Sequence, residues 1–226
     1  MNYSFGIGGY DYQTVYHPVH TVVTPNAGLA VSLDEVKTHL GYDVSDTSND
    51  VELTAFIKAA MNAVEQYCQI TLLSTVFRAD LPVLGLETAL HKRPYTALTK
   101  IEYIRASDGE IVTIDPVTYH VIASHQLRAR LYLGSGKEWP DDDAVRQDAF
   151  RITYSAGWTT DTLPADIKAA LLQIVAKFDA GRGDCEDGAG GASTSVYAMK
   201  NANTTPFPNT AVGLLSPYKL ADVWIV

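Results

Sequence analysis

The chain of 226 residues contains only two cysteines, Cys68 and Cys185. Two thiols cannot build a disulfide framework, and they cannot supply the four ligands of a closed zinc site. A reducing compartment such as the cytosol is therefore the expected setting. Cys68 also closes an apolar helical stripe, which indicates a core residue and not a nucleophile.

Long hydrophobic runs are also missing. No apolar stretch approaches the ~20 residues that a membrane-spanning helix needs. The first six residues, MNYSFG, contain neither a basic region nor an apolar one, so we expect no secretory signal. The sequence therefore predicts a protein without a membrane partner.

Positive charge is scarce as well. The chain has 17 Lys and Arg against 26 Asp and Glu, for a formal net charge of −9 at pH 7. Proteins that hold nucleic acid neutralise its phosphates with Lys and Arg, so this balance argues against tight DNA binding. The main basic residues of the strand-rich region are Lys92, Arg93, Arg128, Arg130 and Arg151. They either face a polyanion or belong to ordinary exposed strand faces.

Motifs that carry chemistry are absent. The glycines at 6–9 precede no helical pattern and no Gly-Lys-Ser/Thr follows them, so they match neither a P-loop nor a dinucleotide fingerprint. No Gly-x-Ser-x-Gly elbow is present. The tripeptide Arg-Gly-Asp at 182–184 is too short a match to carry an argument. We predict no catalytic residue, and a non-enzymatic protein.

Metal ligands are equally sparse. His17 and His20 lie three residues apart, but two ligands do not close a zinc site, and Pro18 disfavours the helix that would align them. The acidic runs at 141–143 and 184–188 lack the distal bidentate Glu of a calcium loop. Solvated loops are the simpler interpretation, so we predict no metal and no cofactor.

Residues 1–31 have the composition of an extended arm. Several glycines and prolines interrupt the stretch, and aromatic residues lie between them at Tyr3, Phe5, Tyr10, Tyr12 and Tyr16. Aromatic side chains favour burial, so such a segment suits packing on a neighbouring molecule. A strand near residues 20–24 that folds onto its own domain is an equally open interpretation.

Three helices are predicted from capping signals and apolar spacing. Ser32 and Glu35 form a capping-box pattern and Gly41 is a natural stop, which gives a helix over 32–41. Helices over 50–69 and 164–180 follow from residues that recur at helical spacing. Their stripes define the predicted helical core, which consists of Leu53, Phe56, Ile57, Val64, Ile167, Leu171, Ile174 and Phe178.

Between these helices the hydrophobic period changes to that of strands. The region 72–158 contains short alternating segments separated by turn signals, among them Asp108-Gly109. We therefore expect an α+β fold: a small helical bundle with an inserted antiparallel β subdomain, an extended N-terminal arm and a C-terminal tail. Residues 32–182 form the core of this arrangement.

The last part of the chain differs in composition. Residues 183–211 are rich in Gly, Ala, Ser, Thr and Asn, which is typical of a flexible linker. Residues 212–226 are apolar again. An apolar tail behind a flexible linker either docks on its own domain or inserts into a partner.

The order of these segments resembles the head–tail connector, or adaptor, family of long-tailed bacteriophages and gene transfer agents. The most specific parts are TYSAGW at 153–158 followed by LPADIKAA at 163–170, and LLSPYK at 214–219. The resemblance covers about residues 32–182 and the patch at 214–219.

This resemblance implies a structural virion protein, present at the neck and assembled in the cytoplasm of a host bacterium. Family members form a ring, usually of about twelve copies, and such a head-to-tail ring needs two different complementary faces on each subunit. The ring lies below the portal, extends the DNA channel and meets a stopper or tail-completion protein. Genomic DNA passes through without tight binding, because an acidic wall repels it.

The same resemblance implies a portal-docking role for the chain's end. The residues expected to contribute are Leu214, Leu215, Pro217, Tyr218, Lys219 and Trp224. A neighbouring neck protein, either stopper or tail terminator, is the first alternative. A small hydrolase is the alternative from another class of protein.

Overall fold

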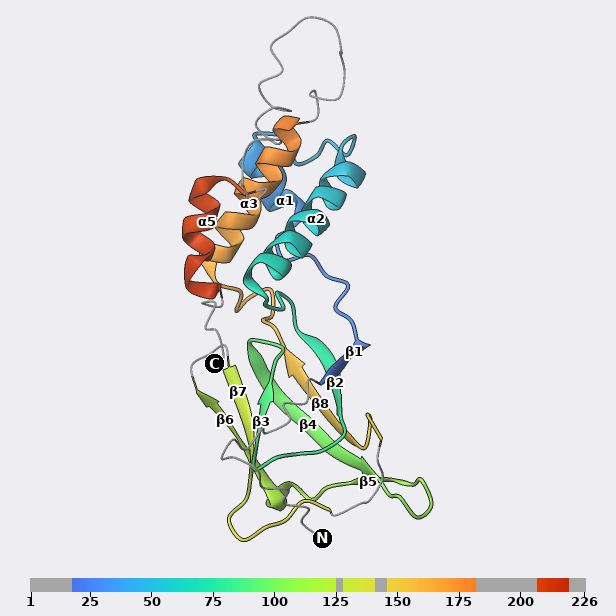
Figure 1. Ribbon diagram of the computed structural model, residues 1–226. Helices are drawn as coiled ribbons and strands as arrows, with labels where there is room; N and C mark the ends of the chain where they lie inside the picture. Colours follow the sequence, from blue (N-terminus) through green and yellow to red (C-terminus); the bar gives the residue numbers. More distant parts are fainter. Residues whose placement is uncertain (1–17, 125–127, 141–145, 182–206, 220–226) are drawn as a thin grey trace, which may run out of the picture.

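A computed structural model describes residues 18–124, 128–140, 146–181 and 207–219 of the chain. The molecule is elongated, with its helices gathered at one end and its strands at the other (Figure 1). Helices and antiparallel sheets in one chain confirm the predicted α+β class. In this described part, no helix has the length and apolar character needed to cross a membrane.

Helix α1 spans Leu33–Leu40 and begins with the expected capping box. The Ser32 Oγ accepts a hydrogen bond from the Glu35 amide at 3.1 Å, and the Glu35 carboxylate accepts one from the Ser32 amide at 2.7 Å. Gly41 ends the helix with a φ of 77°, a left-handed conformation that glycine adopts without strain. Local sequence thus determines both ends of this helix.

Helix α2 spans Asp50–Cys68. Its N-cap is Asn49, but the Asn49 side chain makes no capping hydrogen bond. A buried lysine of α1 instead organises this loop, because the Lys37 Nζ lies 2.6 Å from the Asp50 carboxylate and donates to the Val44 and Asp46 carbonyls. Lys37 is only 2% exposed, so it carries its charge into the bundle with partners that satisfy it.

The bundle is completed by α3 at Ala165–Ala180, α5 at Asn209–Leu215 and the 3₁₀ turn η3 at Ser216–Tyr218. Helix α5 lies along α3, far away in sequence (Figure 1). The helical core buries completely six of the eight residues expected there, namely Leu53, Ile57, Val64, Ile167, Leu171 and Ile174. Phe56 and Phe178 are half-buried at its edge, with ring centroids 6.0 Å apart.

The end of the predicted linker needs correction. We expected flexible chain through residue 211, but Phe207 is 5% exposed and Ala211 is fully buried. Both pack into the helical core, where the Phe207 ring contacts Tyr67 at a centroid distance of 4.9 Å. The surrounding Gly, Ala, Ser, Thr and Asn residues predicted a linker, although Phe207 and Ala211 are apolar side chains that pack in the bundle. Residues 182–206 lie outside the described part of the chain.

The larger sheet has five antiparallel strands in the order β1-β2-β8-β4-β5. These strands are β1 Val19–Thr24, β2 Thr75–Leu81, β8 Phe150–Ala156, β4 Tyr95–Ile104 and β5 Ile111–Thr113. Strands β4 and β5 form the hairpin that Asp108-Gly109 predicted. β1 pairs with β2. This part of the predicted arm therefore folds onto its own domain, which was one of the two interpretations left open by the sequence.

A second sheet has three strands in the order β3-β7-β6. It contains β3 Glu87–Leu90, β7 Arg128–Leu133 and β6 Tyr119–Ser124, with the 3₁₀ turn η1 at Pro116–Thr118 before β6. The sequence did not predict β3. Its four residues show no clear alternation, and it forms because β7 offers it a pairing edge.

The two sheets share a core of their own. Alternate residues of β2 and β8 point into it, among them Phe77, Ile152 and Tyr154. Their neighbours Arg78 and Arg151 lie on the opposite face of the sheet and are only partly buried. The period of two that marked these strands in the sequence therefore separates a core face from a charged face.

The junction between bundle and sheets lies where β8 ends. Gly157 has a φ of 108°, and its amide donates to the Pro94 carbonyl at 2.8 Å. The next residue, Trp158, exchanges backbone hydrogen bonds with the segment that follows α2: its amide donates to Leu72, and its carbonyl accepts from Ser74. The TYSAGW segment thus connects the two halves of the molecule.

Candidate interaction surfaces

The C-terminal segment, residues 207–219, has one face inside the subunit and one face outside. Leu215 is fully buried, whereas Pro217 and Lys219 are exposed and Leu214 and Tyr218 are half-buried. The predicted portal-docking set is therefore not one surface. Leu215 belongs to the subunit's own core in this structure, because its side chain lies in the buried cluster of the bundle and its carbonyl accepts from the Cys68 thiol. Trp224 lies outside the described residues.

Aromatic and cationic contacts fix the end of this segment. The Tyr218 ring lies edge-on to Trp158 at a centroid distance of 6.2 Å. The Lys219 ammonium lies 4.9 Å from the centre of the Tyr67 ring, a cation–π geometry. Two family-like patches that are distant in sequence, TYSAGW and LLSPYK, thus meet in space.

A buried arginine ties the same segment to the junction. Arg93 is 4% exposed, and its guanidinium donates to the carbonyls of Cys68 at 2.5 Å, Gln69 at 3.0 Å and Tyr218 at 3.4 Å. Arg93 therefore joins the end of α2, the β subdomain and the C-terminal segment. Sequence reasoning placed this residue among candidates for a polyanion surface and missed its structural role. A lone Arg before Pro94 gives no signal for it.

Burial at this point also protects the thiol of Cys68. The Cys68 Sγ lies 3.8 Å from the Leu215 carbonyl, and desolvation raises the pKa of the thiol to about 11. A thiol that stays protonated at neutral pH is a poor nucleophile. This agrees with the interpretation of Cys68 as a core residue.

A groove of about 880 Å³ lies between β1 and α2. Its apolar part includes Met61, Leu73 and Phe77, and its polar part includes Glu65 and Lys92. The Glu65 carboxylate accepts a hydrogen bond from the Leu72 amide at 2.8 Å, but burial raises the pKa of this carboxyl above its usual value. No local pattern in the sequence indicates this groove, because its walls come from segments that only the fold brings together.

The β end of this groove contains His20. Burial, together with the nearby charges of Lys92 and His91, lowers the pKa of His20 to about 4. The Tyr154 hydroxyl accepts a hydrogen bond from the Lys92 amide at 3.0 Å and lies 3.2 Å from the His20 Nε2. In the tautomer with its hydrogen on Nδ1, a neutral His20 accepts the Tyr154 proton at Nε2 and completes this chain.

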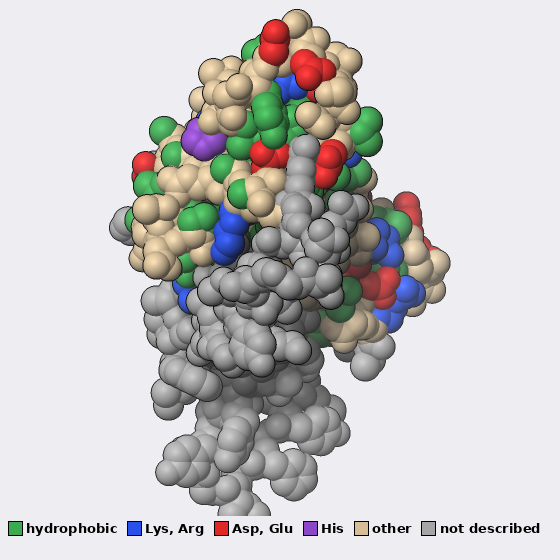
Figure 2. Space-filling model, turned by 90° about the horizontal axis from the view of Figure 1, so that it is seen from above, with side chains coloured by type: hydrophobic (Ala, Val, Ile, Leu, Met, Phe, Trp, Pro, Cys, Tyr) green, Lys and Arg blue, Asp and Glu red, His purple; other side chains and the backbone are tan. Residues whose placement is uncertain are grey.

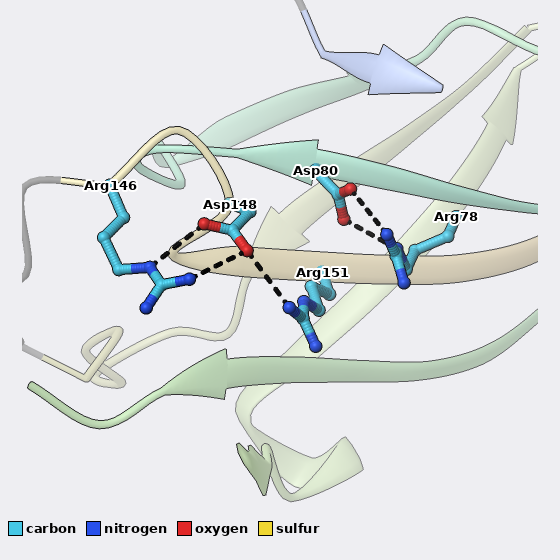
Figure 3. A network of polar contacts seen from close by, with 5 residues as sticks. All are labelled: Arg78, Asp80, Arg146, Asp148 and Arg151. Carbon is cyan, nitrogen blue, oxygen red and sulfur yellow. Dashed lines mark hydrogen bonds and ion pairs between the residues drawn. The ribbon is translucent and has the colours of Figure 1, made fainter. Parts of the chain in front are cut away.

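The outer face of the five-stranded sheet carries paired charges (Figure 3). Arg78 and Asp80, both on β2, form one ion pair with a shortest distance of 2.9 Å. Arg146 and Arg151 both reach Asp148, and their hydrogen bonds lower the pKa of that carboxyl to about 2. The carboxylates thus neutralise most of the arginine charge on this face.

The predicted polyanion surface is therefore not assembled from the five basic residues. Arg151 pairs with Asp148, Arg130 pairs with Glu87, Lys92 lies 5.3 Å from the centre of the Phe77 ring, and Arg93 is buried. The side chain of Arg128 lies outside the described residues. Viewed from the helical end, the described Lys and Arg side chains are scattered among neutral and acidic ones (Figure 2).

Candidate metal ligands are not brought together in the part of the chain that the structure describes. No group of three His, Cys, Asp or Glu side chains there has the arrangement of a metal site. His20 contacts His91 and Tyr154. His17 and the acidic runs at 141–143 and 184–188 lie outside the described residues.

The fold is one already seen in phage-like particles. A chain in the structure described as the neck of an empty gene transfer agent (GTA) particle, computed with C6 symmetry, has a TM-score of 0.69 and 20% identity, with 92% of this chain and 98% of that chain covered. A chain of the virion of a native GTA particle and one of its neck computed with C12 symmetry have the same identity and coverage, with TM-scores of 0.66. The protein therefore shares the fold of GTA neck and virion chains.

The family follows from an independent comparison of the sequence. A model of the head completion protein family matches residues 30–221, which includes the bundle, the C-terminal segment and every strand of the two sheets except β1. The chain belongs to the head completion protein family, and the resemblance to head–tail connectors is confirmed at this level. No curated protein matches the sequence.

Proposed function

We propose that the protein is a head–tail adaptor: a structural, non-enzymatic virion protein that forms a ring below the portal and extends the DNA channel toward the tail. Membership of the head completion family carries this proposal. The likeness to GTA neck chains over 92% of the length supports it. The ring is assigned about twelve copies, in keeping with the C12 symmetry of one such neck.

The portal partner is assigned to the exposed side of the C-terminal segment. Pro217 and Lys219 are exposed there, and half-buried Leu214 and Tyr218 flank them. Buried contacts on the inner side, made by Leu215 and Arg93, hold this surface in one orientation. A rigid surface binds with a smaller entropic cost than a loose tail, so anchoring favours docking.

The other neck partner, a stopper or tail-completion protein, meets a different face of the ring. The location is the virion neck, after assembly in the host cytoplasm, and the ring serves both genome packaging and genome ejection. DNA passes through the channel without tight binding. Net charge of −9 and the internal pairing of Arg78 and Arg151 support weak DNA contact.

Electron microscopy of assembled particles tests the proposal most directly. Labelled chain should form a collar directly below the portal vertex. A position farther along the tail, behind another ring, would instead assign the stopper or terminator role. Absence of the chain from the neck would refute the adaptor role as well as the stopper and terminator alternatives.

Introducing negative charge tests the docking surface. Pro217→Glu with Lys219→Glu alters the exposed side and removes the Lys219 contact with Tyr67, but it leaves Leu215 and Arg93 in place, so the subunit should fold while portal capture in a pull-down falls. Lys137→Glu, an exposed change in a turn of the β subdomain, is the matched control. Undiminished capture by the double variant would reject this surface.

DNA binding by the isolated chain tests the passive channel. Sub-micromolar DNA binding would contradict it.

A further inference from the structure

The outer edge of β1 is open to pairing. β1 is the first strand of the five-stranded sheet, and among the described residues only β2 pairs with it. Proteins normally protect such edges with charged side chains, yet Val19–Thr24 contains no Lys, Arg, Asp or Glu. Val19, Val22 and Val23 are each about half exposed, at 52%, 51% and 52%.

The groove described above adjoins this edge. His20 and Val22 of β1 line it on one side, and Met61 and Gln66 of α2 line it on the other. A segment placed along the open edge of β1 would therefore gain backbone hydrogen bonds from the strand and an apolar surface from the groove. These are the two ingredients of recognition by strand addition.

We propose that this edge and groove receive residues 10–17 of a second copy of the chain. The sequence YDYQTVYH places Tyr10, Tyr12, Thr14 and Tyr16 at every second position, so an extended backbone presents all four on one side. Aromatic and β-branched residues favour strand pairing. Asp11 is the only charged side chain in residues 1–17, so burial of this segment has little electrostatic cost.

The position of β1 favours a second copy over the chain's own segment. β1 begins at Val19, opposite Asp80, and ends at Thr24, opposite Val76 and near the helices. The groove lies toward this second end, between β1 and α2. The chain's own residues 10–17 would have to reverse direction at Pro18 to reach it, whereas a neighbour's segment needs no reversal.

Such an exchange gives a ring its directionality. The donated segment and the accepting groove are different surfaces, so each copy gives to one neighbour and accepts from the other. This is a heterologous contact of the kind that closes a ring. The inference rests on the proposed function, since it takes the ring in the neck as the assembly in which the exchange occurs.

Disulfide trapping in assembled particles tests the exchange. Three double variants are made, each of which carries Val22→Cys and one of Tyr10→Cys, Tyr12→Cys or Tyr16→Cys in the same chain. All three have a Cys185→Ser background, and the particles assembled from each are oxidised. Cys68 is buried and remains as it is. Val117→Cys with Tyr12→Cys is the control, because Val117 is 65% exposed but does not line the groove.

At least one of the three pairs should give a ladder of covalent multimers on a non-reducing gel, and the control should not. Monomers that close internally would assign the groove to the chain's own segment and overturn the proposal. The absence of any disulfide from all three pairs would also overturn it. If these particles still contain the chain in a ring at the neck, the proposed function stands while this inference fails.

Discussion

The α-carbon of Gly157 lies directly against the backbone of Leu73, so that a side chain at 157 would meet the Leu73 carbonyl oxygen at 2.6 Å. The left-handed φ of 108° adds a second reason for glycine at this position. Leu73 follows α2 and Gly157 follows β8, so this contact sets how closely the bundle and the sheets approach.

We expect Gly157→Ala to lower the free energy of unfolding by about 2–4 kcal/mol, because strain and overpacking act together. Urea denaturation measures the change. Gly181→Ala is the matched control, since Gly181 has an ordinary φ of −81° and open space around it. Equal stability of the two variants would show that the Gly157 contact is not restrictive.

The two neighbours Phe56 and Ile57 on α2 should differ in their contribution to stability. Ile57 is fully buried, whereas Phe56 is half-buried at the edge of the core beside Phe178. Ile57→Ala should cost about 2–5 kcal/mol in the free energy of unfolding, and Phe56→Ala less than Ile57→Ala despite the larger side chain removed. A larger loss for Phe56→Ala, measured in the same urea series, would mean that the helix is rotated from its described orientation.

Replacement of Arg93 by Met should loosen the C-terminal segment. The substitution leaves the buried Cys68 carbonyl without this donor, which costs about 1–3 kcal/mol, and it also removes the donor to the part-buried Gln69 carbonyl. Because Leu215 packs over Cys68, release of the segment should also raise the rate at which a thiol reagent modifies Cys68. The measurement uses a Cys185→Ser chain with and without the Arg93 change.

If the Arg93→Met chain remains folded and its Cys68 is still not modified by the thiol reagent, Arg93 is not needed to hold the C-terminal segment over Cys68. That result would mean that the apolar contacts of Leu215 and Phe207 hold the segment by themselves. Lys219→Ala provides the comparison, because it removes the contact with the Tyr67 ring at the surface and leaves the Arg93 hydrogen bonds in place.

Stability should fall in mild acid on account of His20. Its folded-state pKa of about 4 is below the ordinary value of 6.5, so the unfolded chain binds more protons between these two values. The contribution of His20 is therefore complete above pH 6.5 and is lost as the pH falls toward 4. A His20→Gln chain should lose less stability than the wild type between pH 7 and pH 4.5 in thermal melts. Parallel losses would show that His20 is solvated.

Helices α1, α2 and α3 could be predicted from the sequence because their signals are local. Ser32, Glu35 and Gly41 mark the ends of α1 by hydrogen bonds and backbone freedom that involve only near neighbours. The stripe through Leu53, Ile57 and Val64 repeats at the helical period, and that period alone selects the buried face.

Features that join distant segments escaped prediction. Strand β3 depends on pairing with β7, and the role of Arg93 depends on carbonyls at the end of α2 and at Tyr218. Phe207 and Ala211 looked like linker until the bundle supplied a surface for them. In each case the stabilising free energy of the feature comes from contacts with residues that lie far away along the chain.

The amino-acid order thus determined helices α1 to α3, the strands other than β3, the α+β class and the family pattern in TYSAGW and LLSPYK, since all of these depend on spacing and composition along the chain. Only the tertiary structure decided which of these residues can meet a partner. It buried Leu215, exposed Pro217 and Lys219, and left the edge of β1 open beside a groove. For these residues, exposure depends on packing against segments that lie far away along the chain, and the local sequence does not contain that information.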